Sequence, residues 1–249
     1  MPLLEIDNLG KAFGGVQAVR TCSFGVQTGR ITALIGPNGA GKTTVFHLIS
    51  GFFPADSGRI LFEGNDLTRL PAWKRGRMGL SRTFQLSRLF KNLTVEENLL
   101  LALREDDHRF WCMFFRGRRG DGAERKAVAD MMLFVGLEKD PKTPVTDLSY
   151  GQQKLFDLTR VLLHPHRLLM LDEPIAGVNP VLRDRFKVLL KQLKGKGETI
   201  LLIEHDMDFV RAVADEVIVM DQGTVLASGT PAVVLKDPRV LEAYLGLDV

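Results

Sequence analysis

A glycine-rich stretch near the N-terminus carries the strongest chemical signal in the sequence. Residues 36–43 match the spacing G-x-x-x-x-G-K-[S/T]. In such a loop glycines let backbone N–H groups turn toward phosphates, the lysine reaches the outer phosphates, and the following hydroxyl binds Mg²⁺. A glycine-rich turn without a ligand is the alternative. The residues predicted to contact a nucleotide are Gly36, Pro37, Asn38, Gly39, Ala40, Gly41, Lys42, Thr43 and Thr44, with Thr43 also a metal ligand.

Two acids follow an apolar run later in the chain. Leu168 to Leu171 is continuously apolar, as a parallel strand buried on both faces should be, and Asp172 and Glu173 come directly after it. Ligands of open α/β sheets bind at the carboxyl ends of the strands. We therefore predict Asp172 as a ligand of Mg²⁺ and Glu173 as the group that orients an attacking water. An ordinary strand end is the alternative.

The elements that must position these groups alternate between strands and helices. A helix is expected from Lys42 to Gly51, and a second apolar helical face ends at Gly195. Pro231 and Pro238 each begin a short closing helix. Strands are predicted at Leu4 to Leu9, Cys22 to Val26 and Ile31 to Ile35, a stretch typical of the edge of a sheet, and then at Ile60 to Phe62, Leu168 to Leu171, Thr199 to Ile203, Glu216 to Met220 and Thr224 to Ser228.

Helical signals interrupt this alternation for some eighty residues. Thr94 with Glu97 reads as a capping box, and Asp121 with Glu124 opens a second helix. We predict an α/β fold that forms a single domain over residues 1–249. It comprises a parallel core, an antiparallel β-subdomain, a helical subdomain inserted at about 86–165 and closing helices at about 230–249.

Composition excludes several classes of protein. Of 249 residues, 45% are hydrophobic and 25% charged, which is the balance of an ordinary folded protein. The net charge of +3 is too small to indicate nucleic acid or an anionic membrane. Cys22 and Cys112 form no metal-binding or disulfide pattern, and no apolar run approaches the ~20 residues of a spanning helix. With no signal-peptide pattern at the N-terminus, we expect a cytoplasmic protein.

A motif between the glycine-rich loop and the acidic pair resembles that of a known family. Residues 148–153, Leu-Ser-Tyr-Gly-Gln-Gln, resemble the signature sequence of ATP-binding cassette (ABC) ATPases. Ser149 with Gln152 also reads as a capping box, so a well-capped helix is the alternative. The resemblance covers the whole chain and implies the phosphate-loop fold of these ATPases. It implies that ATP with Mg²⁺ is held between two subunits of a head-to-tail dimer, with Ser149, Gly151 and Gln152 facing the ATP of the opposite subunit.

Other positions of the family pattern are filled in order. The resemblance implies that Phe13 stacks on adenine, that Gln85 contacts Mg²⁺ and the attacking water, and that His205 contacts the γ-phosphate. It makes residues 176–179 the loop that faces the partner. An isolated phenylalanine or histidine would otherwise more often be structural. Tyr150 and Asn179 depart from the commoner glycine and aspartate of the general pattern.

Finer motifs resemble one subgroup, the ATPase subunits of branched-chain amino acid importers. They are residues 82–86, 88–90, 92–98, 149–153, 176–180, 229–231 and 237–246. The subgroup implies that ATP hydrolysis powers import of branched-chain or related amino acids through separate membrane permease subunits. It also implies a second ATPase subunit, the same or a related chain, and a solute-binding protein that acts indirectly. The chain would be peripheral, on the cytoplasmic side of the plasma membrane.

Several alternatives stay open at this point. Related ABC systems carry amides, urea or lipid, and some soluble ABC ATPases act on nucleic acid. A phosphate-loop kinase or GTPase is a further alternative, but those enzymes lack the signature sequence found at residues 148–153. We expect no nucleic-acid partner. The aromatic and basic segment 110–120 suits a helix-end cluster, a permease or membrane contact, or a nucleic-acid contact.

Overall fold

The computed structural model describes residues 2–83, 89–103 and 122–245. Gln85 and the segment 110–120 therefore lie outside the described residues. The chain divides into two compact units. The first comprises Met1–Arg82, Arg167–Pro174 and Asp184–Val249, and the second comprises Thr83–His166 and Ile175–Arg183.

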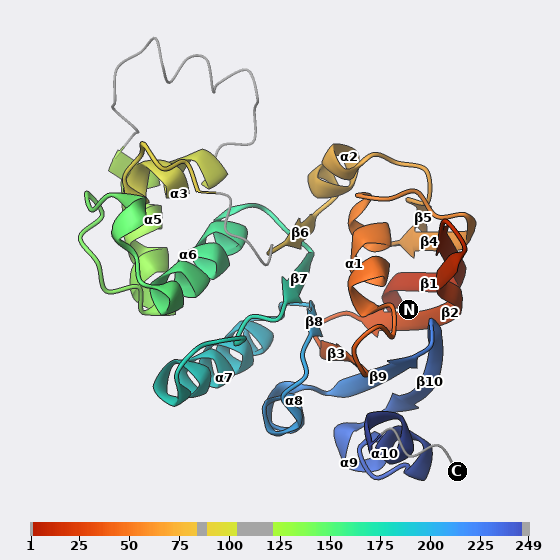
Figure 1. The fold of residues 1–249 in the computed structure, drawn as a ribbon. Helices are drawn as coiled ribbons and strands as arrows, with labels where there is room; N and C mark the ends of the chain where they lie inside the picture. The colour runs from red at the N-terminus through yellow and green to blue at the C-terminus, as the bar shows by residue number, and fades with distance from the viewer. Residues whose placement is uncertain (1, 84–88, 104–121, 246–249) are drawn as a thin grey trace. The chain divides into compact units, whose positions relative to one another are not determined.

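Two sheets form the framework of the first unit (Figure 1). An antiparallel sheet has the order β2-β1-β4-β5, and a larger sheet has the order β10-β9-β3-β8-β7-β6. In the larger sheet β10 is antiparallel to β9, and the other neighbours are parallel. The strands are β1 (Pro2–Phe13), β2 (Val16–Gln27), β3 (Ile31–Ile35), β4 (Ser57–Phe62), β5 (Asn65–Asp66), β6 (Leu80–Arg82), β7 (Leu168–Asp172), β8 (Ile200–Ile203), β9 (Glu216–Asp221) and β10 (Thr224–Gly229). The predicted α/β class is confirmed.

The sheet edge predicted for the first part of the chain is present at β2, which begins the order β2-β1-β4-β5, but the prediction was wrong for β1. β1 pairs with β2 on one side and with β4 on the other. Its apolar residues Leu4, Ile6 and Leu9 are buried because one face of the strand packs on the core. The alternation reports this buried face and does not depend on whether a second strand pairs with β1.

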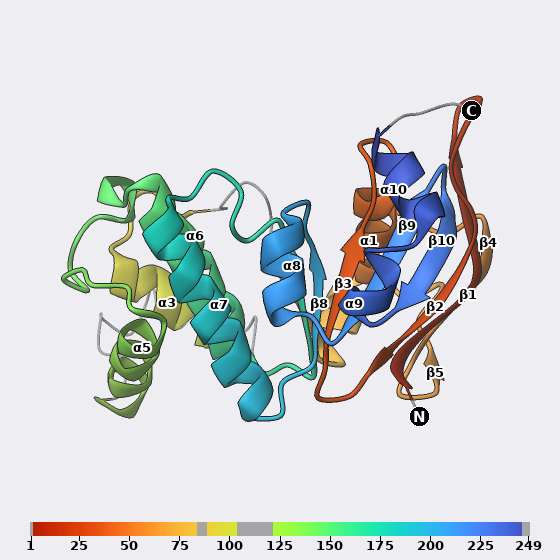
Figure 2. The ribbon, with the colours of Figure 1, turned by 90° about the horizontal axis from the view of Figure 1, so that it is seen from below.

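Helix α1 (Lys42–Ser50) lies between the two sheets (Figures 1 and 2). Its residues Val45, Phe46, Leu48 and Ile49 belong to one buried cluster with residues of β1, β2, β3, β7, β8 and β9. Helix α8 (Met207–Val213) covers the opposite face of the larger sheet (Figure 2). Packing of α1 against both sheets fixes the direction in which the start of this helix points. The remaining helices of this unit are α2 (Ala72–Arg77), α9 (Pro231–Val234) and α10 (Pro238–Leu245), together with most of α7 (Pro180–Gly195).

The second unit is helical. It contains α3 (Val95–Leu103), α5 (Gly122–Val135), a 3₁₀ turn (Val145–Asp147) and α6 (Tyr150–Leu163). The capping box at the start of α3 is confirmed: Glu97 accepts hydrogen bonds from the N–H of Thr94 at 2.9 Å, and the Thr94 hydroxyl accepts from the N–H of Glu97 at 3.2 Å. The second predicted helix is present as α5, although Asp121 lies outside the described residues. In the described ranges, every helix is too short or too polar to cross a bilayer.

Candidate nucleotide-binding site

The glycine-rich loop joins β3 to α1. Gly36 and Gly41 have φ values of 148° and 96°, in a region that side chains disfavour. A Cβ atom at Gly36 would lie 2.1 Å from the carbonyl oxygen of Met220 in β9, and one at Gly41 would lie 2.4 Å from that of Ala18 in β2. Only glycine fits these two positions, because the loop runs directly against the backbone of two strands.

Lys42 is the first residue of α1, and its ammonium lies over the loop. Its Nζ donates hydrogen bonds to the carbonyl oxygens of Gly36 and Pro37, each at 2.8 Å. Burial lowers the pKa of Lys42, while the negative charges of Glu173 and Asp172 raise it. A phosphate group in the loop would offer this ammonium charged acceptors in place of neutral carbonyls.

The start of α1 suits an anion. Gly41 at the N-cap provides no side-chain hydrogen bond, and the first turn contains no acidic residue. The first N–H groups of a helix have no partner within the helix, so this end favours negative charge. Asn38, Gly39 and Thr43 are exposed, so a ligand can approach the loop from solvent.

Three neighbouring strands end beside this loop. β8 lies between β3 and β7, and its residue Ile203 pairs with Leu34 on one side and with Asp172 on the other. The carboxyl ends of parallel strands form the edge at which open α/β sheets bind ligands. This strand order brings the phosphate loop, the acidic pair Asp172–Glu173, and His205, two residues after β8, to one edge of the sheet.

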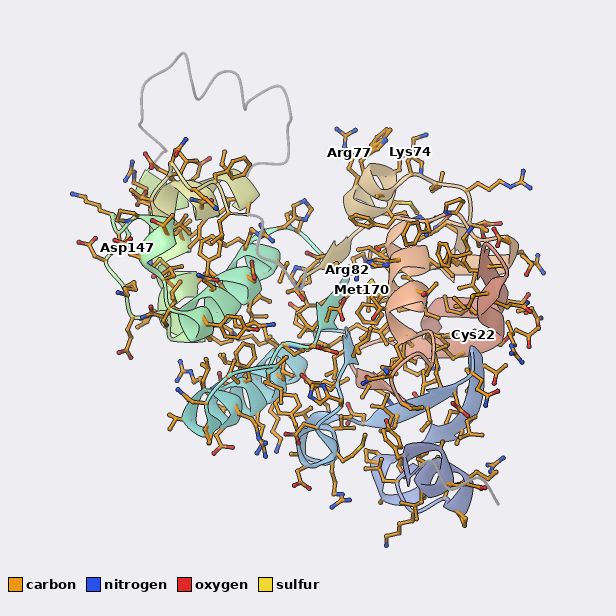
Figure 3. The ribbon with its side chains drawn as sticks, in the orientation of Figure 1. Cys22, Lys74, Arg77, Arg82, Asp147 and Met170 are labelled. Atoms are coloured by element: carbon orange, nitrogen blue, oxygen red, sulfur yellow. The ribbon has the colours of Figure 1, made fainter. Side chains whose placement is uncertain are left out.

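Asp172 is buried and bonded to a cation. The Nη2 atom of Arg82 donates to its Oδ2 at 2.8 Å, and the two side chains are 6% and 2% exposed, respectively. Arg82 is the last residue of β6, which pairs with β7 (Figure 3). A carboxylate is costly to bury without an opposite charge, and Arg82 supplies that charge.

Glu173 combines a constrained backbone with an accessible carboxylate. Its φ is 47°, and its N–H donates to the carbonyl oxygen of Ile203 at 3.1 Å. A left-handed conformation costs a non-glycine residue about 1–2 kcal/mol, and such strain concentrates at functional sites. The side chain is one-third exposed, and its Oε1 lies 4.0 Å from Nδ1 of His205. The carboxylate can therefore reach a water molecule from a fixed backbone.

Phe13 lies at the end of β1. Its ring is 41% exposed and meets Phe53 edge to face, with 5.2 Å between ring centroids. The Nζ atom of Lys11 lies 5.4 Å from the centroid of the Phe13 ring. An exposed aromatic ring beside a cation can accept a planar base, so the adenine contact stays a prediction with a compatible geometry.

Ser149, Gly151 and Gln152 lie at the start of α6, in the second unit. The predicted capping box is confirmed: the Ser149 hydroxyl accepts from the N–H of Gln152 at 3.4 Å, and Oε1 of Gln152 accepts from the N–H of Ser149 at 3.0 Å. A Cβ atom at Gly151 would lie 2.7 Å from Cδ2 of Leu182. Ser149 is exposed, so this helix start is open to solvent.

Tyr150 joins this helix start to residues 176–179. Its hydroxyl donates to the carbonyl oxygen of Ala176 at 3.1 Å. A Cβ atom at Gly177, whose φ is 70°, would lie 3.0 Å from the Tyr150 ring. Asn179 in turn accepts from the N–H of Leu182 at 2.8 Å in the first turn of α7. The two segments that the family pattern assigns to the dimer partner are thus held together within one unit.

The oxygen ligands at the sheet edge suit Mg²⁺. A hydroxyl at Thr43 and a carboxylate at Asp172 are the hard donors that this ion prefers. Thr43 is exposed on the first turn of α1, and the buried charge of Asp172 already attracts a cation. The third predicted ligand, Gln85, lies outside the described residues.

Two groups near the acids were not predicted from the sequence. Arg82 belongs to the family motif at residues 82–86 without a role of its own, and Glu204 lies in no motif. Glu204 is fully buried, accepts from the N–H of His205 at 3.2 Å and has its Oε2 3.9 Å from the ring nitrogen Nδ1. A charged residue directly after an apolar strand is a signal that could have identified Glu204.

Comparisons with known proteins agree with this geometry. The family described as ABC transporter matches residues 19–176, and a family described as branched-chain amino acid ATP-binding cassette transporter matches residues 224–249. The high-affinity branched-chain amino acid transport ATP-binding protein BraF of Pseudomonas aeruginosa is 40% identical over 250 residues, which cover 98% of each chain. The protein LivG of Escherichia coli, with the same description, is 39% identical over 98% of each chain.

Solved structures show the same fold. A nucleotide-free ATP-binding cassette from an ABC transporter superposes with a TM-score of 0.86 at 34% identity, covering 99% of this chain and all of the other. A cassette in its ADP conformation gives the same TM-score, identity and coverage. The chain belongs to the ABC transporter family and is one of its ATP-binding, ATP-hydrolysing cassettes.

Proposed function

We propose that this chain is the ATP-hydrolysing subunit of an importer for branched-chain or related amino acids. The observation that carries the proposal is the phosphate loop and the pair Asp172–Glu173 at one sheet edge, in a chain similar along its whole length to branched-chain amino acid transport ATP-binding proteins. The chain acts at the cytoplasmic face of the membrane with separate permease subunits. A solute-binding protein delivers the amino acid without contacting this chain.

The phosphates of ATP occupy the loop over residues 36–41. Backbone N–H groups of the loop and of the first turn of α1, including those of Thr43 and Thr44, donate to them, and Lys42 turns from the carbonyls of Gly36 and Pro37 to the outer phosphates. Thr43 and Asp172, with Gln85, would hold Mg²⁺, which would neutralise charge on the phosphates. Phe13 stacks on the adenine.

Glu173 and His205 act on the terminal phosphate. The Glu173 carboxylate orients a water molecule and accepts its proton, and His205 contacts the γ-phosphate. Ser149, Gly151 and Gln152 bind the ATP of a second ATPase subunit in a head-to-tail dimer. ATP contacts both subunits only when they are closed, so its binding favours closure and loss of the γ-phosphate favours reopening. That motion drives the permease.

Glu173→Gln tests the assigned base. The amide keeps the size of the side chain but cannot accept the proton, so we expect ATP binding to change less than 3-fold and turnover to fall at least about 100-fold. Equilibrium binding of a fluorescent ATP analogue and phosphate release measure the two quantities. Glu138→Gln, at an exposed position in the second unit, is the matched control. Turnover within 3-fold of the unmodified protein would remove Glu173 as the base.

A reconstituted transporter tests the solute and the alternatives. The chain is assembled in vesicles with its permease and solute-binding protein, and ATP turnover is measured with leucine, an aliphatic amide or urea. We expect leucine to stimulate turnover and the other solutes to have less effect. Stimulation by amide or urea alone would reassign the solute, and stimulation by RNA or DNA without permease would favour the nucleic-acid alternative.

A further inference from the structure

The buried contact between Arg82 and Asp172 places a fixed positive charge on a residue that the proposed function assigns to Mg²⁺. The two residues end neighbouring parallel strands, β6 and β7, and Arg82 stands opposite Met170 in the register (Figure 3). The Arg82 Nη2 and Asp172 Oδ2 atoms are 2.8 Å apart, and water is nearly excluded from both side chains. Charged groups in such surroundings interact strongly because little solvent screens them.

Arg82 is held in place by more than Asp172. Its Nη1 donates to the hydroxyl of Ser50 at 2.9 Å, and that hydroxyl donates to the carbonyl oxygen of Phe46 at 2.7 Å. The guanidinium carbon lies 5.4 Å from the ring centroid of Phe46 and 5.9 Å from that of Phe52. These partners belong to α1 and the residues after it. The guanidinium therefore has a defined position between β7 and the helix of the phosphate loop.

A cation in this position has two effects on Asp172. It balances the carboxylate in the metal-free protein and, through Oδ2, fixes the direction of the other oxygen. It also repels a second cation that approaches the same carboxylate. When Mg²⁺ arrives bound to a nucleotide, the negative charges of the phosphates offset its repulsion from Arg82. Free Mg²⁺ has no such negative charges beside it, so the repulsion stays.

We propose that Arg82 is a resident counter-cation of the metal-binding carboxylate, which keeps Asp172 oriented before metal arrives and restricts Mg²⁺ binding to the nucleotide complex. Arg82 is a positioning residue, because it acts through Asp172. The inference rests on the proposed nucleotide site and adds a specific consequence to it: metal enters and leaves with the nucleotide.

The test is thermal unfolding of the nucleotide-free protein with and without 10 mM Mg²⁺. We expect the unmodified protein to be insensitive to the ion. Arg82→Met removes the guanidinium that is bonded to the buried carboxylate, so the midpoint of the variant falls by about 10 °C in EDTA, and Mg²⁺ restores at least half of that loss. Arg20→Met, at an exposed position on β2, is the control and shows neither effect.

A second variant keeps the inference testable if Arg82→Met does not fold. Arg82→Met combined with Asp172→Asn removes both charges, so we expect this double variant to fold, to unfold at a higher temperature than Arg82→Met, and to show no response to Mg²⁺. A Mg²⁺ response in the double variant, or none in a folded Arg82→Met protein, would overturn the inference. So would stabilisation of the unmodified protein by Mg²⁺ alone.

Binding of Mg·ATP to the unmodified protein is measured separately. If it is absent, the proposed nucleotide site fails. If Mg·ATP binds normally while Arg82→Met shows no Mg²⁺-dependent recovery, only the role of Arg82 fails.

Discussion

The polar groups of the two units are stabilised in different ways. At the sheet edge of the first unit, Asp172 and Arg82 are buried and paired with each other. At the start of α6 in the second unit, Ser149 and Tyr150 are exposed and are held by a capping box and one hydroxyl contact. Buried charges require partners before any ligand arrives, whereas an exposed helix start does not. The first region is thus organised before any ligand arrives, and the second is exposed, as the proposed contact with the ATP of another chain requires.

Lys42→Ala tests the first region most severely. Removing the ammonium deletes charge-assisted contacts to phosphate, so we expect the dissociation constant for ATP to rise about 100-fold, a loss of about 3 kcal/mol. Isothermal titration calorimetry on the isolated chain measures it, with Lys74→Ala on α2 as the control. If the Lys42→Ala variant binds ATP as tightly as the unmodified protein, the loop is not the phosphate site, and the comparison of the two regions is wrong.

Arg75→Met tests how far buried polar groups support the phosphate-loop helix. Arg75 is 2% exposed and donates to the carbonyl oxygens of Leu48 and Ile49, at the end of α1, at 2.6 and 2.8 Å. Methionine removes both buried donations and leaves Leu48 only its bond from the N–H of Gly51, so we expect the free energy of unfolding to fall by about 3 kcal/mol. Urea denaturation measures it. The exposed Lys74→Met is the control, and an equal loss in both would refute the role of the buried bonds.

Ser149→Ala makes the corresponding test of the second region. Loss of the N-cap hydroxyl should cost about 1 kcal/mol, less than the loss of Arg75, because the helix end is already solvated. Hydrogen exchange at the first-turn amides of α6 measures the change, and Thr146→Ala, in the preceding turn, is the comparison. We expect nucleotide binding to the isolated chain to be unchanged. Weaker nucleotide binding by the isolated Ser149→Ala chain would contradict the proposal that the first region alone binds the nucleotide of its own chain.

His47→Gln is expected to have the smallest effect. Burial lowers the pKa of His47 below 6.5, the positive charge of Arg82 adds to this, and Asp172 opposes it. As pH falls below about 6.5, the unfolded chain binds a proton that the folded chain does not, so stability decreases until the folded pKa is reached. His47→Gln should make the free energy of unfolding less dependent on pH between 7 and 5.5, measured by urea denaturation. An unchanged slope would exclude His47 as the source.

Local patterns predicted much of the fold and the site. The glycine spacing of residues 36–43, the acids after an apolar run and the capping boxes at Thr94 and Ser149 depend on neighbours within a few positions, and the expected strand, helix or cap is present at each. The edge position expected of the first strand failed because alternation reports one buried face and says nothing of how many strands flank it.

Contacts between distant residues were beyond such patterns. Arg82 and Asp172 are 90 positions apart, and they meet because β6 pairs with β7, which no local signal specifies. The bond from Tyr150 to Ala176 likewise depends on how a helix start meets a loop 26 positions later. The left-handed backbone of Glu173 could not be predicted, because glutamate has no preference for it.

The central place of β8 has a mechanical consequence. Ile203 pairs in register with Leu34 of the strand that leads into the phosphate loop and with Asp172 of β7, and its carbonyl also accepts from the N–H of Glu173. Because the phosphate loop and the acids follow strands that both pair with β8, one strand holds the two groups at a common spacing. In the proposed function, the distance between the bound phosphates and the Glu173 carboxylate would therefore depend on the pairing of β8 with its two neighbours.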